Sequence, residues 1–304
     1  LINKPSTFYK LVKYYYKNSN KINPSLIMWL YKILPVVNNL PDIFHIQWAK
    51  SLSFWFFLKE IFNTKIILSL RGAHINYSPL SDIKLATEYR KLFPSVDFFH
   101  AVSKSILKEA SKYSNIEKNT KVIYSAFDFS MLKNLKQKKY RSNREQFHFI
   151  SVGRFHWKKA YHLSILAVNE LLKKGINVTY TIIAIDHPSE EILYEIKDLD
   201  ISDKIFIKSI SSQEKVYQEI SNSDCLILPS TEEGIANVVI ESMAIGTPVI
   251  SSDCGGMKEI ISKQYNGFLF KSRDLFDLVE KMEKTILLNG EEKDYLIKNA
   301  KLTV

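Results

Sequence analysis

The residues best suited to chemistry lie between Leu228 and Gly256, in the stretch LPSTEEGIANVVIESMAIGTPVISSDCGG. An apolar run is followed by an acidic turn with Glu233 and Gly234, and Asn237 is a good N-cap for the helix that we expect next. The first amides of such a helix favour a bound anion. Glu241 lies about one turn into the helix, where side chains lean toward its start. We therefore expect a phosphate on the amides, with one carboxylate for ribose hydroxyls and one for sugar hydroxyls. The alternative is a solvated acidic turn and an exposed helix glutamate.

A second candidate stretch, VGRFHWKKA, spans residues 152–160. Gly153 permits a tight turn directly after an apolar run, and Arg154 and Lys159 follow it. Two cations at the carboxyl end of a strand are suited to hold a diphosphate and to stabilise its charge as it leaves. Alternatively, Arg154 caps a neighbouring helix and Lys159 is an ordinary surface lysine.

Both stretches follow short β-rich runs that alternate with amphipathic segments of helix length, which is typical of a parallel sheet with covering helices. In such sheets ligands bind beyond the carboxyl ends of the strands, where both stretches fall. The expected strands are 43–46, 65–70, 97–102 and 121–124 in the first half, and 147–152, 178–185, 205–207, 225–228, 249–251 and 268–270 in the second. The expected helices are 51–62, 103–113, 160–174, 189–199, 211–222, 237–245, 256–262 and 273–288.

The polar, cationic segment 133–145 has no apolar periodicity and is typical of a linker. We therefore expect two domains, 1–140 and 146–304, each long enough to bury its own core. Residues 1–145 hold 24 Lys and Arg against 9 Asp and Glu, a net charge of +15, whereas residues 146–304 hold 18 against 23, a net charge of −5. This asymmetry predicts that the two domains meet different partners.

These stretches resemble retaining glycosyltransferase family 4, whose members have the two-domain GT-B fold. The resemblance extends over roughly residues 41 to 288. In the second half it rests on four ordered matches: Gly153-Arg154 with Lys159, Glu233-Gly234 with Glu241, Gly255-Gly256 with Glu259, and Asn266–Leu269. PDIFHIQWA at 41–49, Ser103 and KVIYSAFD at 121–128 are similar in the first half. The resemblance implies two Rossmann-like, doubly wound domains that face each other across a cleft.

The resemblance also implies the activity of a hexosyltransferase. The sugar of a UDP- or GDP-linked donor would move, with retention, to a polysaccharide, oligosaccharide or lipid-linked acceptor of the kind found in bacterial polysaccharides and glycolipids. Arg154 and Lys159 would neutralise the donor diphosphate, Glu233 would contact the donor sugar and Glu241 would hold ribose hydroxyls. The remaining donor-binding positions would be Gly153, Ser230, Gly234, Ile235, Asn237 and Val238. No cofactor is implied.

The sequence departs from the family pattern at several positions. Ala126 and Ala160 replace usual glycines, and Arg71-Gly72 occupies the usual His-Gly position, which leaves His45 and His74 as substitutes or as structural residues. Only about 40 residues precede the 41–49 match, and the usual final helices are absent. We therefore expect a first domain without its first βαβ unit, in a fragment or a naturally truncated copy. The alternative function is an inactive protein that binds nucleotide sugar or acts as a scaffold.

The overall charge of +10 raises nucleic acid as a partner, but the sequence has no recognised nucleic-acid motif, so we expect none. The basic first half favours an anionic membrane surface or acceptor. Within it, the segment 8–17 interleaves aromatics with lysines, which is typical either of an interfacial helix or of an ordinary surface helix.

No apolar run is long enough to span a bilayer, and two cysteines, Cys225 and Cys254, fit a reducing compartment. We expect these thiols to be buried, in a cytoplasmic protein peripheral on the inner face of the plasma membrane. Asp198 and Asp200 have the spacing of a metal site but fall at a helix end among polar residues, so we expect a solvated turn there and no catalytic metal.

Overall fold

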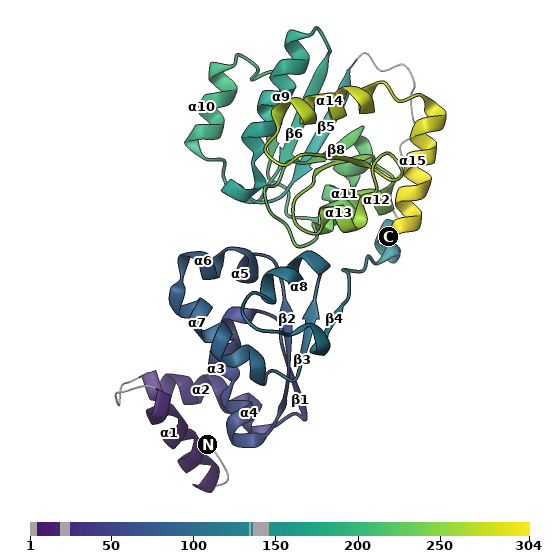
Figure 1. Cartoon of the computed structure of the whole chain (residues 1–304). Helices are drawn as coiled ribbons and strands as arrows, with labels where there is room; N and C mark the ends of the chain where they lie inside the picture. The colour runs from purple at the N-terminus through teal and green to yellow at the C-terminus, as the bar shows by residue number, and fades with distance from the viewer. Residues whose placement is uncertain (1–4, 19–24, 134, 136–145) are drawn as a thin grey trace. The chain divides into compact units, whose positions relative to one another are not determined.

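The computed structural model describes residues 5–18, 25–133, 135 and 146–304. The chain divides into two compact units, Leu1–Ile123 and Tyr124–Val304 (Figure 1). The division falls ahead of the expected linker because Phe127, Leu132 and Leu135 pack against the core of the second unit. Most of the linker expected at 133–145 lies outside the described residues. Within the described ranges, no helix is long and apolar enough to cross a membrane.

The first unit has a parallel four-stranded sheet in the order β1-β2-β3-β4. The strands are β1 (Ile43–Ile46), β2 (Lys65–Leu70), β3 (Phe98–Ala101) and β4 (Thr120–Val122). Alternate residues of β2 point to one face, where Ile66, Leu68 and Leu70 are fully buried against the helices of this unit. The helices after β1 are η1 (Ala49–Ser51), α3 (Leu52–Trp55), α4 (Phe57–Phe62), α5 (Ala73–Asn76), α6 (Ser78–Ser81), α7 (Ile83–Leu92), η2 (Phe93–Ser95), α8 (Lys104–Ala110) and η3 (Glu117–Asn119).

Two helices precede β1, α1 (Pro5–Asn18) and α2 (Ser25–Asn38). The first covers the lysine and aromatic segment 8–17, so that segment is helical. The sequence did not predict the second, because Lys32 and Pro35 interrupt its apolar run. Pro35 nevertheless lies inside α2.

The second unit has a six-stranded parallel sheet in the order β10-β9-β8-β5-β6-β7. Its strands are β5 (Phe147–Val152), β6 (Val178–Ile183), β7 (Ile205–Lys208), β8 (Cys225–Leu228), β9 (Val249–Ser252) and β10 (Phe268–Phe270). Neighbouring residues of β5 enter different cores, Phe149 on one face and Ile150 on the other, which is why the strand reads as an almost continuous apolar run. Both cysteines are buried, as expected.

The helices of the second unit lie on both faces of this sheet (Figure 1). They are η4 (Phe129–Leu132), η5 (Trp157–Lys159), α9 (Tyr161–Lys173), α10 (Glu190–Asp198), α11 (Gln213–Asn222), α12 (Asn237–Ile245), α13 (Met257–Ile260), α14 (Leu275–Ile286) and α15 (Gly290–Thr303). From β5 the chain adds strands outward on one side and then, from β8, outward on the other. Doubly wound sheets bind ligands beyond the carboxyl ends of the strands at such a reversal, here between β5 and β8.

Candidate functional site

The ends of two side chains lie close to the first position of the loop after β5. A Cβ at Gly153 would lie 2.9 Å from the Tyr161 hydroxyl and 3.1 Å from Lys159 Cε. At the other end of the loop Ala160 has left-handed backbone, with φ 49° and ψ 41°. That conformation favours glycine, which is the residue that the family resemblance led us to expect there. The loop therefore turns back on itself and brings Lys159 close to its own start.

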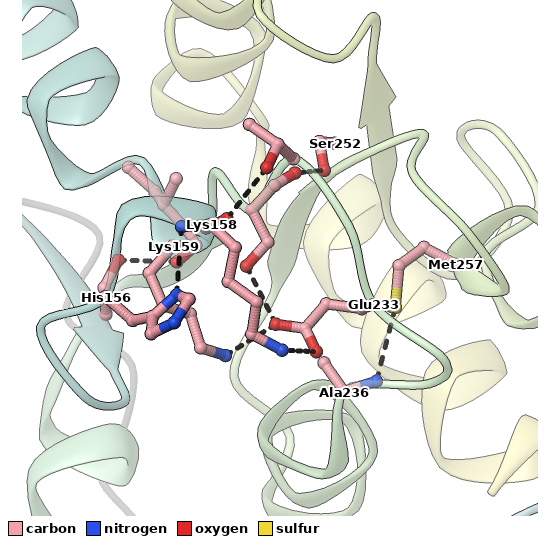
Figure 2. Close-up of polar contacts among 11 residues, drawn as sticks. His156, Lys158, Lys159, Glu233, Ala236, Ser252 and Met257 are labelled. Atoms are coloured by element: carbon pink, nitrogen blue, oxygen red, sulfur yellow. Dashed lines mark hydrogen bonds and ion pairs between the residues drawn. The ribbon is translucent and has the colours of Figure 1, made fainter. Parts of the chain in front are cut away.

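Glu233, in the turn after β8, is the residue on which this loop converges. Its carboxylate accepts hydrogen bonds from Lys159 Nζ at 2.7 Å and from Lys158 Nζ at 3.4 Å, on one oxygen each. The Ser230 hydroxyl donates to the same oxygen as Lys159, at 3.1 Å. Figure 2 shows both lysine side chains reaching the carboxylate from η5. The two sequence stretches thus meet side chain to side chain at the switch point.

The carboxylate of Glu233 is held in its charged form. Burial alone would raise the pKa of Glu233, but the charges of Lys159 and Lys158 and hydrogen bonds from Lys159 and Ser230 outweigh it and lower the pKa below its usual value. The side chains of Lys159 and Glu233 are only 15% and 10% exposed, so water screens this pair far less than a surface pair. At neutral pH the turn therefore offers an ionised hydrogen-bond acceptor.

Backbone bonds hold the two loops together independently of the charges. The Thr231 amide donates to the Lys158 carbonyl at 2.7 Å, which joins the two loops. The Ser252 hydroxyl, at the end of β9, donates to the Ser230 carbonyl and fixes the start of the loop after β8. Because β5 and β8 are paired neighbours, the loops that leave their carboxyl ends begin side by side. The pairing of the strands and the hydrogen bonds to main-chain carbonyls thus hold the two loops of the site in place.

A glycine turn after β9 supports the Glu233 turn from behind. Gly255 has φ +48°, and a Cβ there would lie 1.8 Å from the Glu233 carbonyl oxygen. The Gly256 amide donates to the same carbonyl at 3.2 Å. Nearby, Met257 Sδ accepts from the Ala236 amide at 3.5 Å (Figure 2). These contacts give the Gly-Gly pair, noted above only as a family match, a physical role.

The start of α12 differs from our expectation, because Asn237 is not the N-cap. Ala236 is the N-cap, with extended backbone and no side-chain cap, and Asn237 is the first helical residue, exposed. The Ala236 amide donates to Met257 Sδ outside the helix, and the helix begins one residue earlier than an Asn237 cap would require. In the described part of the chain the amides of Asn237 and Val238 have no acceptor, and they remain available to an anion.

Glu241 lies one turn into α12 and faces Tyr217 of α11. Burial raises the pKa of Glu241, while a hydrogen bond from the Tyr217 hydroxyl opposes that rise. Burial and the charge of Glu241 raise the pKa of Tyr217 to about 12, so the phenol remains a donor. Glu241 is therefore half-buried and oriented, as a residue that reads hydroxyls needs to be.

Arg154 is exposed, and within the described residues no ion pair holds it. Its charge nevertheless acts on the loop: burial lowers the pKa of His156, and the charges of Lys158, Arg154 and Lys159 lower it further. Three cations therefore crowd one short loop. Lys158 was not predicted from the sequence. The only signal for it is its place next to Lys159.

The remaining candidates lie elsewhere. His45 Nε2 is 2.9 Å from the Ser69 hydroxyl within the first sheet, and the His74 ring packs on Trp48 with centroids 4.9 Å apart. Asp198 and Asp200 are exposed at the end of α10. Among the described residues, no three His, Cys, Asp or Glu side chains are placed to hold a metal ion.

Known proteins resemble this chain in sequence and in fold. A family model described as glycosyl transferases group 1 matches residues 133–303. An uncharacterized glycosyltransferase of Methanocaldococcus jannaschii is 24% identical over 258 residues, which cover 78% of this chain and 62% of that relative. The putative colanic acid biosynthesis glycosyltransferase WcaL of Escherichia coli K12 is 26% identical over 158 residues, which cover 50% of this chain and 39% of WcaL. The chain therefore spans less than two thirds of the length of either relative.

Two solved structures resemble the chain over most of its length. Anabaena HepE, solved in complex with UDP-glucose, has a TM-score of 0.74 at 18% identity, with 86% of this chain and 73% of HepE covered. A glycosyltransferase from Rickettsia africae has a TM-score of 0.76 at 20% identity, with 94% and 78% covered. These likenesses confirm the expected fold class, two Rossmann-like parallel-sheet domains of the GT-B type.

Proposed function

Because the chain belongs to the group 1 glycosyl transferases, we propose that it moves a sugar from a nucleotide-sugar donor to a polysaccharide, oligosaccharide or lipid-linked acceptor, with retention. The observation that carries the proposal is the convergence of Lys158, Lys159 and Glu233 at the switch point of the second sheet. UDP is the first nucleotide to test, since HepE was solved with UDP-glucose. GDP is the second.

The residues divide the donor between them. The cations of the loop after β5 and the first amides of α12 would hold the diphosphate, while Glu241 would accept hydrogen bonds from ribose hydroxyls. Glu233 would accept from hydroxyls of the donor sugar, for which its ionised state is suited. Until a donor binds, the Glu233 carboxylate pairs with the two lysines, where the donor phosphate would later bind.

The proposed reaction assigns a step to each of these positions. The bond between the anomeric carbon and the phosphate oxygen breaks, its electron pair leaves with the diphosphate, and the acceptor oxygen bonds to the same face of the carbon. The acceptor proton passes to the departing phosphate oxygen, so no protein nucleophile is needed. Arg154, Lys158 and Lys159 stabilise the charge that grows on the diphosphate. These three cations supply what a divalent metal would supply, and we therefore propose a metal-independent enzyme without a cofactor.

The setting of the reaction is part of the proposal. The net charge of +15 on residues 1–145 suits an anionic acceptor or an anionic membrane surface. Lipid-linked acceptors are found at such a surface, and the two free cysteines are compatible with the reducing side of the membrane. We place the enzyme in the cytoplasm, peripheral on the inner face of the plasma membrane.

Two carboxylate variants test the division of the donor. Glu241→Ala is expected to weaken binding of UDP and of UDP-sugar alike, by about tenfold or more, because a ribose contact is present in both ligands. Glu233→Ala is expected to leave UDP affinity unchanged or stronger, since it frees both lysines, and to weaken only the intact donor. Calorimetric titration with each ligand measures both effects, with Glu170→Ala, a half-buried glutamate of α9 paired with Lys173, as control.

Equal losses for both ligands in both variants would show that the two carboxylates are wrongly assigned. If neither variant differs from the control, the donor site itself is misplaced. Donor binding without transfer to any acceptor would favour the inactive, nucleotide-sugar-binding protein instead.

A further inference from the structure

The two helices that precede the first sheet form one packed pair. Leu11 of α1 and Ile33 of α2 are fully buried against Phe57 of α4. Trp29 of α2 packs on Tyr15 and on Phe57, with ring centroids 5.4 and 5.3 Å apart. Figure 1 shows α1 and α2 beside each other at one end of the unit. The inner sides of both helices are therefore packed on the unit, and this packing determines which side chains of each helix face outward.

The outer side of α2 is apolar. Ile27 is 75% exposed, Met28 57% and Tyr31 75%, and helix spacing places these three on one stripe with Lys32 beside it. A helix that is apolar on both its inner and outer sides is normally covered all round or lies against lipid. On α1, Phe8 and Tyr9 are also exposed, at 48% and 67%. Large apolar side chains thus face outward from both helices of the pair.

Every charge on these two helices is positive. Lys10, Lys13 and Lys17 are exposed at three- and four-residue spacing, which aligns them along α1. Residues 1–41 contain six lysines and no Asp or Glu. Among the groups of α4, Glu60 lies near enough to Tyr14 for its charge to add to the effect of burial in raising the pKa of that phenol. The exposed side chains of α1 and α2 thus include large apolar groups, and every charged side chain among them is a lysine.

We propose that the outer surface of the α1–α2 pair docks on an anionic lipid bilayer, with Ile27, Met28 and Tyr31 in the interface and the lysines on the headgroups. The inference rests on the proposed function in one respect, that a lipid-linked acceptor gives the enzyme a reason to be there. A bilayer offers both an apolar layer and negative charge, so it matches both features of this surface. A second copy of the chain would instead bring two lysine-only surfaces together, and like charges repel.

Flotation of the whole chain with vesicles measures the docking directly. We expect binding to vesicles of phosphatidylcholine with phosphatidylglycerol, little binding to phosphatidylcholine alone, and weaker binding at high salt. Substitution of Lys10 and Lys13 by Gln should lower the affinity by more than tenfold, at about fivefold for each lysine. Ile27→Ser with Tyr31→Ser should lower it by about tenfold or more, because apolar area no longer enters the interface.

Matched controls come from the same unit. Leu80 of α6 is 80% exposed and Lys118 of η3 is exposed, so Leu80→Ser and Lys118→Gln make similar changes outside the pair. Both controls should bind vesicles like wild type, and circular dichroism should find all variants folded. Equal loss in variants and controls, or equal binding to neutral vesicles, would overturn the proposal. So would a concentration-dependent dimer that Ile27→Ser abolishes. UDP calorimetry on the same variants should be unchanged, which separates failure of the docking from failure of the donor site.

Discussion

Replacing Lys159 with alanine is expected to lower kcat by ~10²–10³-fold, the usual loss when one preorganised donor to a developing charge is removed. The diphosphate gains charge as the glycosidic bond breaks, so an ammonium group contributes more in the transition state than in the bound ground state. Donor affinity should therefore fall less than kcat. A thermal-shift screen first identifies the nucleotide sugar that raises the Tm of the protein most. The readout is the rate at which each variant hydrolyses that nucleotide sugar, because hydrolysis requires no knowledge of the acceptor.

Lys173→Ala is the control for this variant, since Lys173 is an exposed lysine of α9 paired with Glu170. Lys158→Ala should lower kcat as well, but less, because its Nζ lies 3.4 Å from Glu233 compared with 2.7 Å for Lys159. A Lys159→Ala enzyme with unchanged kcat would exclude a catalytic role for this lysine. A variant that loses donor affinity while kcat stays unchanged would place its contribution in binding alone.

The second large effect is expected from Gly255→Ala. The new Cβ would lie 1.8 Å from the Glu233 carbonyl oxygen, well inside contact distance, so the turn that carries Glu233 has to move. We expect the free energy of unfolding to fall by about 3 kcal/mol or more, from overpacking added to a left-handed backbone. The affinity for the intact donor should fall as well, because both lysines and Ser230 lose Glu233 as their partner. Thermal unfolding and donor titration measure the two effects.

Gly175→Ala separates backbone strain from collision. Gly175 has φ +76°, yet nothing lies within 4 Å of a Cβ built there. This control should lower the free energy of unfolding by only about 1–2 kcal/mol and leave donor binding intact. If the two alanine variants were equally stable, the contact between Gly255 and the Glu233 turn would carry no weight in the fold.

The strands of this chain are readable from the sequence because buried parallel strands are short apolar runs bounded by polar loops. Strands β5 and β8, which flank the site, have the residues expected from those runs. Helix α15 was missed although Asn289 and Glu292 form a capping box at its start. Helix α2 was missed because a proline in an apolar run normally argues for a break.

The sequence predicts the place of a side chain that directly follows a strand. It does not predict a contact with a residue far away in the chain. Arg154, Lys159 and Glu233 follow β5 and β8, so their edge of the sheet could be predicted. Asn237 was the wrong N-cap: the helix includes it, and the cap is Ala236, whose amide donates to Met257 Sδ, 21 residues further along the chain. Lys158 was missed because adjacent residues of a strand or helix point apart, whereas in η5 both lysines reach one carboxylate.

The most direct test of the donor site is calorimetric titration of the whole chain with UDP, and with GDP, in the presence of EDTA. The proposal predicts binding of one nucleoside diphosphate per chain, unchanged when Mg²⁺ replaces EDTA and weakened when Arg154, Lys158 and Lys159 are all replaced by alanine. Binding that appears only with the metal, or that survives loss of all three cations, would contradict the assignment of the diphosphate to the loop after β5.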